Sequence, residues 1–217
     1  MSRIDLNKTL AELAGPPPQP KASTPGRNSS SDLRDVPAEY RRFTLADYPA
    51  SVRAQLAPFF DGRRWSAYLW GSVGTGKSCL AGAMLRECRE TRISRYEGGW
   101  GEFLTPERLR SATLDLERGF IRFAAWQAAA VLVLDDLAAL RGTPHVVEHL
   151  IRLIGTRYDE RRATIVTSNL SLDALGQHLD PRIASRFQAG LVLDLGQVDR
   201  RRGNSQSAIR NSQSEIA

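Results

Sequence analysis

Residues 71–78 read Gly71-Ser72-Val73-Gly74-Thr75-Gly76-Lys77-Ser78. The three glycines allow the backbone to curl tightly, so that successive N–H groups point inward and form a nest for an anion. In this pattern the ammonium of Lys77 reaches the β- and γ-phosphates of a nucleotide, and the hydroxyl of Ser78 ligates Mg²⁺. The stretch therefore predicts a phosphate-binding loop with ATP and Mg²⁺ as its ligands.

The segments on either side of the loop have the composition that this motif requires. Residues 66–70 form a short apolar run and are expected to be a strand, whereas residues 79–92 have helical composition. A strand before the loop and a helix after it distinguish a phosphate-binding loop from a chance match in a glycine-rich turn. The loop also keeps Lys77, one of only three lysines among 30 basic residues.

Two adjacent carboxylates, Asp135 and Asp136, follow a run of four aliphatic residues. A strand buried on both faces delivers its C-terminal residues to the sheet edge where the phosphate-binding loop lies. Asp135 is the expected Mg²⁺-site carboxylate, and Asp136 is placed to polarise the attacking water. A divalent cation would relieve the repulsion between the two. The alternative is a surface turn, where Asp is common.

Three further side chains are candidates for the same chemistry. Asn169 ends another apolar strand and could hold the lytic water or the γ-phosphate, although Asn is also ordinary at strand ends. Asp180 and Pro181 predict a helix start, after which Arg182 and Arg186 share one face. Such a pair suits an arginine finger that completes a neighbour's ATP site. The alternative is a solvated basic face.

The alternation of short apolar runs with helical segments predicts an α/β fold. Strands are expected at 66–70, 130–134, 163–167 and 191–195, and helices at 46–60, 79–92, 106–123, 146–158 and 181–187. Such an alternation implies a parallel sheet that is covered on both faces.

Composition limits the classes of partner. The chain has 217 residues, a net charge of +6 and a pI of about 9.8, which favours polyanions such as nucleic acid. The predominance of arginine could equally reflect codon bias. No apolar run is long enough to span a membrane, and the N-terminus lacks the apolar core of a signal peptide, so a cytoplasmic protein is expected. Cys79 and Cys88 are expected to be reduced, because both lie on one helix.

The two ends of the chain differ in composition from the middle. We expect residues 1–36 to be a tail, 37–202 the globular domain, and 203–217 a disordered polar end. In the tail, Ser2 and Asp5 have capping-box spacing, and Leu6, Leu10 and Leu13 form an apolar stripe before a proline-rich linker. A short tethered helix suits docking into a partner's groove. The alternative is a terminus without a role.

Taken together, these motifs resemble the AAA+ ATPases, and within them the DnaC/DnaI helicase loaders and the IstB transposition ATPases, over residues 40–202. The phosphate-binding loop and the acidic strand 132–137 resemble Walker A and Walker B. The pair Arg157-Tyr158 precedes Asn169, which matches sensor 1. Residues 182–187, Arg-Ile-Ala-Ser-Arg-Phe, resemble the arginine-finger box that loaders share with the initiator DnaA.

The resemblance implies a three-layer αβα core of the P-loop NTPase type around a five-stranded parallel sheet. It implies a homo-oligomer in the ATP state, single-stranded DNA binding, and a replicative helicase held through residues 1–15. The loop of residues 92–100 lies where relatives contact DNA. There, Arg92 and Arg95 could bind phosphates, and Tyr96 and Trp100 could stack on bases. No full lid domain is expected to supply a sensor 2 arginine, and Arg200, Arg201 and Arg202 are the alternative candidates for that role.

Several functions remain open at this point. The leading hypothesis is a helicase-loader-like ATPase in DNA replication, with slow hydrolysis stimulated by DNA or a partner. An IstB-like transposition helper would bind duplex DNA and a transposase. A small-molecule kinase fits poorly, because it needs a lid with arginines. A non-hydrolysing, nucleotide-gated adaptor, in which ATP only orders an interface, is the remaining alternative. Asp136 stands where many AAA+ proteins have glutamate, and its shorter side chain could hydrolyse slowly or hold water differently.

Overall fold

The computed structural model describes residues 35–90, 101–115, 118–140 and 143–196. The expectations for the tail 1–34, for the candidate DNA-contacting loop 92–100, for Arg200–Arg202 and for the polar end 203–217 fall outside these residues. Asp35 and Val36, which the sequence analysis assigned to the tail, are packed on the domain, with Val36 1% exposed. The other domain limits stay predictions.

The centre of the domain is a five-stranded sheet in which every pairing is parallel. The strands are β1 (Ser66–Trp70), β2 (Gly101–Leu104), β3 (Val131–Leu134), β4 (Ala163–Ser168) and β5 (Leu191–Asp194), in the order β2-β3-β4-β1-β5. This sheet confirms the predicted α/β fold. Four strands coincide with the apolar runs, whereas β2 was implied only by the family resemblance. Its short segment begins with Gly101 and Glu102, which are not strand formers.

The pairing register brings the carboxyl ends of three strands to one edge of the sheet. Trp70 at the end of β1 pairs with Ser168 of β4, and Leu134 at the end of β3 pairs with Val166 of β4. Residues that follow β1, β3 and β4 therefore emerge together, which is where ligands bind in open parallel sheets.

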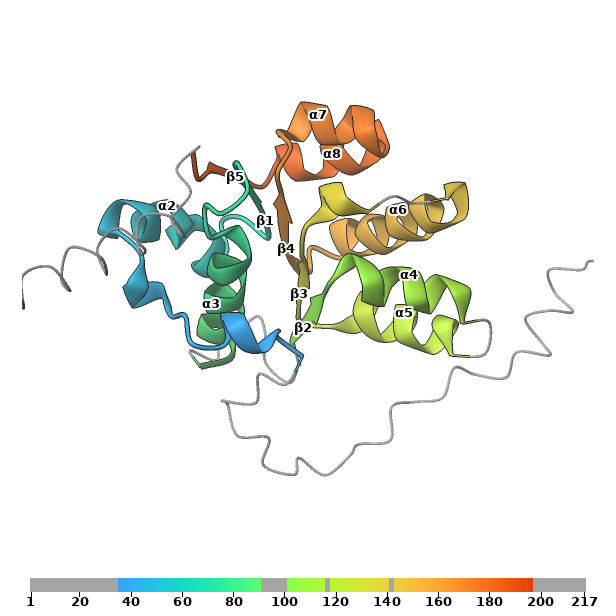
Figure 1. The fold of residues 1–217 in the computed structure, drawn as a ribbon, viewed down its shortest axis with the longest axis horizontal. Coiled ribbons are helices and arrows are strands. Elements are labelled where there is room, and N and C mark those ends of the chain that lie inside the picture. The colour runs from blue at the N-terminus through green and yellow to red at the C-terminus, as the bar shows by residue number, and fades with distance from the viewer. Residues whose placement is uncertain (1–34, 91–100, 116–117, 141–142, 197–217) are drawn as a thin grey trace, which may run out of the picture. The chain divides into compact units, whose positions relative to one another are not determined.

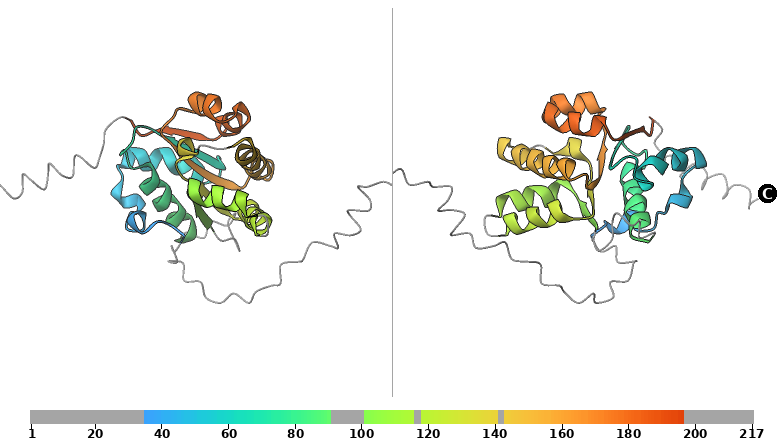
Figure 2. Two further views of the ribbon diagram at one scale, coloured as in Figure 1. Left: turned by 45° about the vertical axis from the view of Figure 1, so that its right-hand side comes forward. Right: turned by 180° about the vertical axis from the view of Figure 1, so that it is seen from behind.

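Helices cover both faces of the sheet (Figure 1). One face carries α2 (Ala50–Phe60), α3 (Lys77–Glu90) and the short turns η1 (Ala38–Tyr40) and η2 (Leu45–Asp47). The other face carries α4 (Pro106–Leu114), α5 (Gly119–Ala128), α6 (Pro144–Asp159), α7 (Leu172–His178) and α8 (Pro181–Gln188). The two rotated views in Figure 2 show the same division.

Alternate strand residues supply the two hydrophobic layers. Leu69, Val133 and Ile165 pack with Leu80 and Met84 of α3. Their neighbours Tyr68, Leu132 and Val166 face the opposite way and pack in a second cluster with α4 to α8. This alternation follows from the two-residue period of a strand, and burial on both sides explains why these strands are almost wholly apolar.

Two predicted helices need correction. The expected helix 106–123 is divided into α4, which ends at Leu114, and α5, which begins at Gly119. A Cβ on Gly119 would lie 2.3 Å from the carbonyl oxygen of Ala112, so only glycine allows this approach. The expected helix 46–60 begins only at Ala50, after Pro49, because the residue before a proline is disfavoured in α conformation.

Helix α7 was not predicted from the sequence. It begins after Ser171, whose hydroxyl oxygen accepts a hydrogen bond from the N–H of Ala174 (3.3 Å). Helix α7 is only a seven-residue helix, so its hydrophobic periodicity is too short to recognise. None of the helices in the described part of the chain combines the length and apolar character that a membrane span requires.

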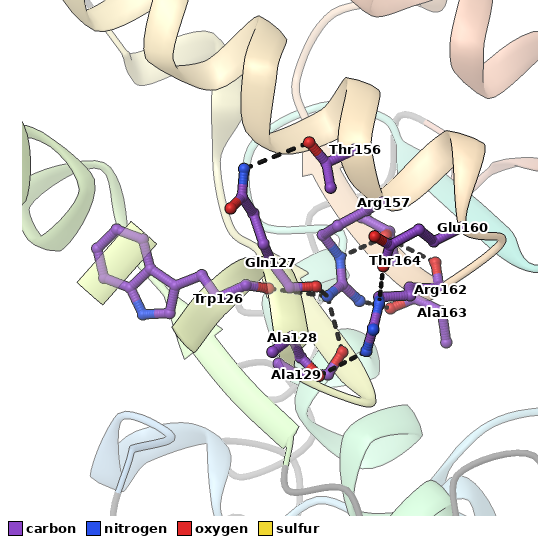
Figure 3. A network of polar contacts seen from close by, with 10 residues as sticks. All are labelled: Trp126, Gln127, Ala128, Ala129, Thr156, Arg157, Glu160, Arg162, Ala163 and Thr164. Carbon is purple, nitrogen blue, oxygen red and sulfur yellow. Dashed lines mark hydrogen bonds and ion pairs between the residues drawn. The ribbon is translucent and has the colours of Figure 1, made fainter. Parts of the chain in front are cut away.

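Arg157 of α6 is fully buried and holds the far end of the sheet together (Figure 3). Its guanidinium donates to the carbonyls of Trp126 (2.8 Å), Gln127 (3.2 Å) and Ala129 (2.7 Å), to Ala163 O, and to Oγ1 of Thr164 (3.0 Å). The first two acceptors lie in the last turn of α5 and Ala129 follows it, where the helix dipole favours a cation. Burial lowers the pKa of Arg157 to about 9, which leaves it charged at neutral pH. Arg157 is therefore a structural residue.

Candidate nucleotide-binding site

A cavity of about 810 Å³ opens at the edge of the sheet where β1, β3 and β4 end. The phosphate-binding loop contributes Val73, Gly74, Gly76, Lys77 and Ser78. Strand β3 is followed by Asp135 and Asp136, and β4 contributes Thr167 and is followed by Asn169. The segment before α2 contributes Glu39, Tyr40, Arg42, Phe43, Asp47 and Tyr48. The cavity thus joins the predicted phosphate loop, acidic pair and Asn169 in one place.

The loop has the backbone conformation that only glycines adopt easily. Gly74 and Gly76 have φ values of 87° and 88°, and Gly71 has 147°. At Gly71 a Cβ would also lie 2.8 Å from the carbonyl oxygen of Gly196. The N–H of Ser72 donates to this same carbonyl (3.1 Å), so the segment after β5 supports the start of the loop.

Lys77 is the first residue of α3 and its ammonium group lies over the loop. Its Nζ donates to the carbonyls of Gly71 (3.0 Å) and Ser72 (2.7 Å), and the residue is 9% exposed. The hydroxyl of Thr75 donates to Ser72 O as well (3.0 Å). These contacts hold the loop closed around the N-terminus of α3, where backbone N–H groups attract an anion.

Asp135 and Asp136 are joined to β4 by one hydroxyl group. Oγ1 of Thr167 donates to Oδ1 of Asp135 (2.7 Å) and accepts from the N–H of Asp136 (2.8 Å). Asp136 has left-handed backbone angles, with φ 46° and ψ 54°, which are uncommon for a residue other than glycine. The sequence analysis places Thr167 only within a predicted strand and does not predict its bonds to the two aspartates.

The environment of Asp135 suits a hard divalent cation. Asp135 is 8% exposed, and burial is the largest cause that raises the pKa of its carboxyl, while hydrogen bonds from Thr167 and Ser78 lower it. The carboxylate and the Ser78 hydroxyl thus offer two oxygen ligands beside the phosphate loop. Mg²⁺ prefers such oxygens and keeps several waters, so the residues fit the predicted ion.

The segment before α2 supplies aromatic side chains that the sequence analysis did not assign to the site. Tyr40, Phe43 and Tyr48 line the cavity. The hydroxyl of Tyr48 donates to Gly76 O (3.4 Å). A mostly apolar lining with a few polar groups is typical of a site for a flat organic ring. The three aromatic residues fall within nine positions of the sequence, and this clustering is the signal that could have assigned the segment to the site.

Arg182 and Arg186 lie on α8, away from the described lining of the cavity. Arg182 pairs with Asp180 (3.0 Å) and Glu148 (3.6 Å), and its side chain is 57% exposed. Arg186 lies 5.6 Å above the ring of Tyr158 and packs on Gly155. Neither arginine lines the chain's own cavity. If either is catalytic, it therefore acts at the nucleotide site of a neighbouring molecule.

The sequence is similar to that of a replication initiator. It is 25% identical over 199 residues to the chromosomal replication initiator protein DnaA of Cereibacter sphaeroides, which covers 87% of this chain and 42% of that protein. The chain therefore spans less than half the length of this curated relative. No protein-family model matches it.

Solved structures share the fold. The DnaC helicase loader matches with a TM-score of 0.57 and 24% identity, covering 75% of this chain and all of that one (100%). DnaI matches with a TM-score of 0.61 and 20% identity, covering 76% and 93%. DnaA bound to AMPPCP and single-stranded DNA matches with a TM-score of 0.60 and 20% identity, covering 73% and 50%.

The five-stranded parallel sheet and its glycine-rich phosphate loop have the α/β P-loop fold of the AAA+ type. The chain is thus similar in sequence to DnaA and in fold to DnaC and DnaI, which confirms the predicted resemblance to the DnaC/DnaI group of AAA+ proteins.

Proposed function

We propose that the chain is a Mg²⁺-dependent ATPase that acts in DNA replication as a DnaC-like helicase loader. The observation that carries this proposal is the convergence of Lys77, Ser78, Asp135 and Asn169 on one cavity, in a fold related to replication proteins. Lys77 would bind the β- and γ-phosphates, Asn169 would hold the γ-phosphate or the lytic water, and Asp136 would polarise that water. Bound Mg²⁺ would neutralise phosphate charge between Ser78 and Asp135.

The partners belong to the same proposal. The chain binds single-stranded DNA and a replicative helicase, the latter through residues 1–15. In the ATP state it forms a homo-oligomer in which Arg182 and Arg186 reach a neighbour's γ-phosphate. Support comes from the position of both arginines outside their own cavity, and from relatives described as a helicase loader and as an initiator bound to single-stranded DNA.

The test is ATP turnover by the purified full chain, measured alone, with single-stranded DNA and with duplex DNA. Lys77→Ala is the blank, because it removes the phosphate-binding ammonium. Stimulation by single strands that disappears in Lys77→Ala is the expected result, and capture of a replicative helicase that depends on residues 1–15 would extend it. Stimulation by duplex alone would favour a transposition helper.

A second variant distinguishes a turnover-dependent loader from a nucleotide-gated adaptor. Asp136→Asn keeps the size of the side chain and removes the charge that polarises water. A turnover-dependent loader loses activity in this variant while still binding ATP. An unchanged biological activity in Asp136→Asn, or no turnover of wild-type protein under any condition, would instead assign the chain to nucleotide-gated adaptors.

A further inference from the structure

The N-terminal end of α6 carries two histidines whose rings meet outside the nucleotide cavity. His145 and His149 are four residues apart and therefore lie on one face of the helix. Their Nε2 atoms are 3.2 Å apart. The rings stand edge to face, with an interplanar angle of 84° and centroids separated by 4.4 Å. The two Nε2 atoms thus lie within hydrogen-bonding distance of each other.

The distance between these nitrogens matches the separation of two ligands on one zinc ion. With Zn–N bonds of about 2.0–2.1 Å and tetrahedral angles, two ligating nitrogens stand about 3.3–3.4 Å apart. The observed distance is 3.2 Å. In the present arrangement one Nε2–H donates to the other Nε2. For a metal ion to bind both Nε2 atoms, the donating ring would move its proton from Nε2 to Nδ1, so that each neutral ring carries its one proton on Nδ1.

One of the two rings is already held in position. His149 stacks on Phe123 of α5, with centroids 4.9 Å apart and an interplanar angle of 27°. Phe123 in turn packs edge-on against Trp126 (5.1 Å). His149 is half-buried and His145 is exposed, so an ion can reach the pair from solvent. Because His149 is constrained, little side-chain entropy remains to be lost on binding.

The protonation state of His149 also favours a metal. Burial, His145 and Arg152 lower the pKa of His149, against a smaller opposing effect of Glu148. A lowered pKa favours the neutral imidazole, which is the form that ligates metals. The N-terminal end of the helix dipole acts in the same direction, because it disfavours the imidazolium.

The order of the residues is that of a known zinc-binding helix. His145-Val146-Val147-Glu148-His149 has the H-x-x-E-H pattern. Glu148, however, pairs with Arg182 at 3.6 Å, and no cluster of three or more His, Cys, Asp or Glu within the described ranges could hold a metal. We propose that His145 and His149 form a two-histidine binding site for a divalent transition metal of the zinc type, completed by water and without peptidase chemistry.

The experiment is calorimetric titration of the metal-free full chain with Zn²⁺ alone. We expect one ion to bind, and its affinity to fall at least about tenfold in His145→Ala and in His149→Ala. His178→Ala is the matched control, because His178 is the third histidine of the chain and lies on α7. Asp135→Asn excludes binding at the candidate Mg²⁺ site. Both controls should keep the wild-type affinity.

A second measurement guards against misfolding of a variant. Zn²⁺ should raise the melting temperature of the wild-type chain through linkage, and His145→Ala, whose ring is exposed, should abolish this rise while keeping the metal-free melting temperature. Absence of Zn²⁺ binding by the wild type would overturn the proposal. Equal affinity in the wild type and both histidine variants would overturn it as well.

Discussion

Oγ1 of Thr167 donates to Oδ1 of Asp135 across neighbouring strands, with 2.7 Å between the two oxygens. The same hydroxyl accepts the backbone N–H of Asp136 (2.8 Å). One buried side chain therefore orients the carboxylate of the candidate metal site and stabilises the left-handed turn that follows it. Thr167 therefore acts as a positioning residue for both aspartates.

Replacing Thr167 with valine tests this role. Thr167→Val keeps the shape of the side chain but leaves the N–H of Asp136 without its acceptor, so the free energy of unfolding should fall by about 1–3 kcal/mol. Apparent Mg²⁺ affinity in ATP turnover should fall too, because Asp135 loses its orienting bond. Thr167→Ser retains the hydroxyl and should restore both quantities. Equal losses in Thr167→Ser would assign the effect to packing instead.

Asp135 should lower the stability of the chain in the absence of ligand. Burial raises the pKa of its carboxyl above the value in the unfolded chain. A raised pKa means that this group stabilises the fold fully only below the unfolded pKa, near 3.8, and that the contribution is lost as the pH rises through the folded pKa. Asp135→Asn should therefore be more stable than the wild type at pH 7.

Urea unfolding at several pH values measures this difference. The advantage of Asp135→Asn should shrink as the pH falls toward 4, because the wild-type carboxyl then becomes protonated. Added Mg²⁺ and ATP should stabilise the wild type and not the variant. A variant that is less stable than the wild type at pH 7 would contradict the argument.

The backbone of the phosphate loop and the strand before Asp135 were more predictable from sequence than the aromatic residues that line the cavity. The glycines of 71–78 require a particular backbone, and four aliphatic residues before Asp135 require a buried strand, so local rules were enough there. Tyr40 and Tyr48 reach the cavity only because the segment before α2 packs on α3, which is a tertiary effect. Likewise, nothing local to Thr167 distinguishes it from any other threonine in a strand.

The helices also differ in whether local sequence or a tertiary contact determines them. Helix α8 was predicted because Asp180 and Pro181 mark its start in the sequence. The break between α4 and α5 was missed, since Gly119 is needed there for its closeness to Ala112, a contact that hydrophobic periodicity does not contain. The edge strand β2 was also not predicted from the hydrophobic pattern. Part of its support is a tertiary contact, because the N–H of Phe103 donates to the carboxylate of Asp35 (2.9 Å).

The two cysteines should differ sharply in reactivity. Cys88 is 3% exposed, and burial raises its pKa to about 12, whereas Cys79 is half-buried and lines the cavity. Iodoacetamide at pH 8 should therefore label Cys79 and spare Cys88, because the thiolate is the reactive form. ATP with Mg²⁺ should slow labelling of Cys79. Mass spectrometry of native and urea-unfolded protein measures both effects, and labelling of native Cys88 would contradict them.

Arg157 should be required for stability and not for nucleotide binding. Arg157→Lys keeps a positive charge but cannot reach all the carbonyls that the guanidinium fork joins. Several buried acceptors then lose their donor, and the free energy of unfolding should drop by at least about 3 kcal/mol. Urea unfolding measures this, with ATP affinity recorded below the transition.

Arg162 provides a matched control for that measurement. It also donates to a carbonyl near the end of α5, Ala128 O at 2.7 Å, but at an exposed position. Arg162→Lys should therefore change the free energy of unfolding by no more than about 0.5 kcal/mol. A similar cost for both variants would show that burial of the Arg157 network is not what makes it important.

Arg182 and Arg186 should act between molecules if they act in catalysis at all. Lys77→Ala removes a chain's own phosphate contact, and the double variant Arg182→Ala/Arg186→Ala removes the residues that would serve a neighbour. Each protein alone should be inactive under the DNA condition that stimulates the wild type. A mixture of the two should recover turnover, because an intact Lys77 site in one chain can meet intact arginines from another. Single substitutions then separate Arg182, which is exposed, from Arg186, which is packed on Tyr158. If the mixture stays inactive while both proteins remain folded and form mixed oligomers, the arginines are structural residues of α8.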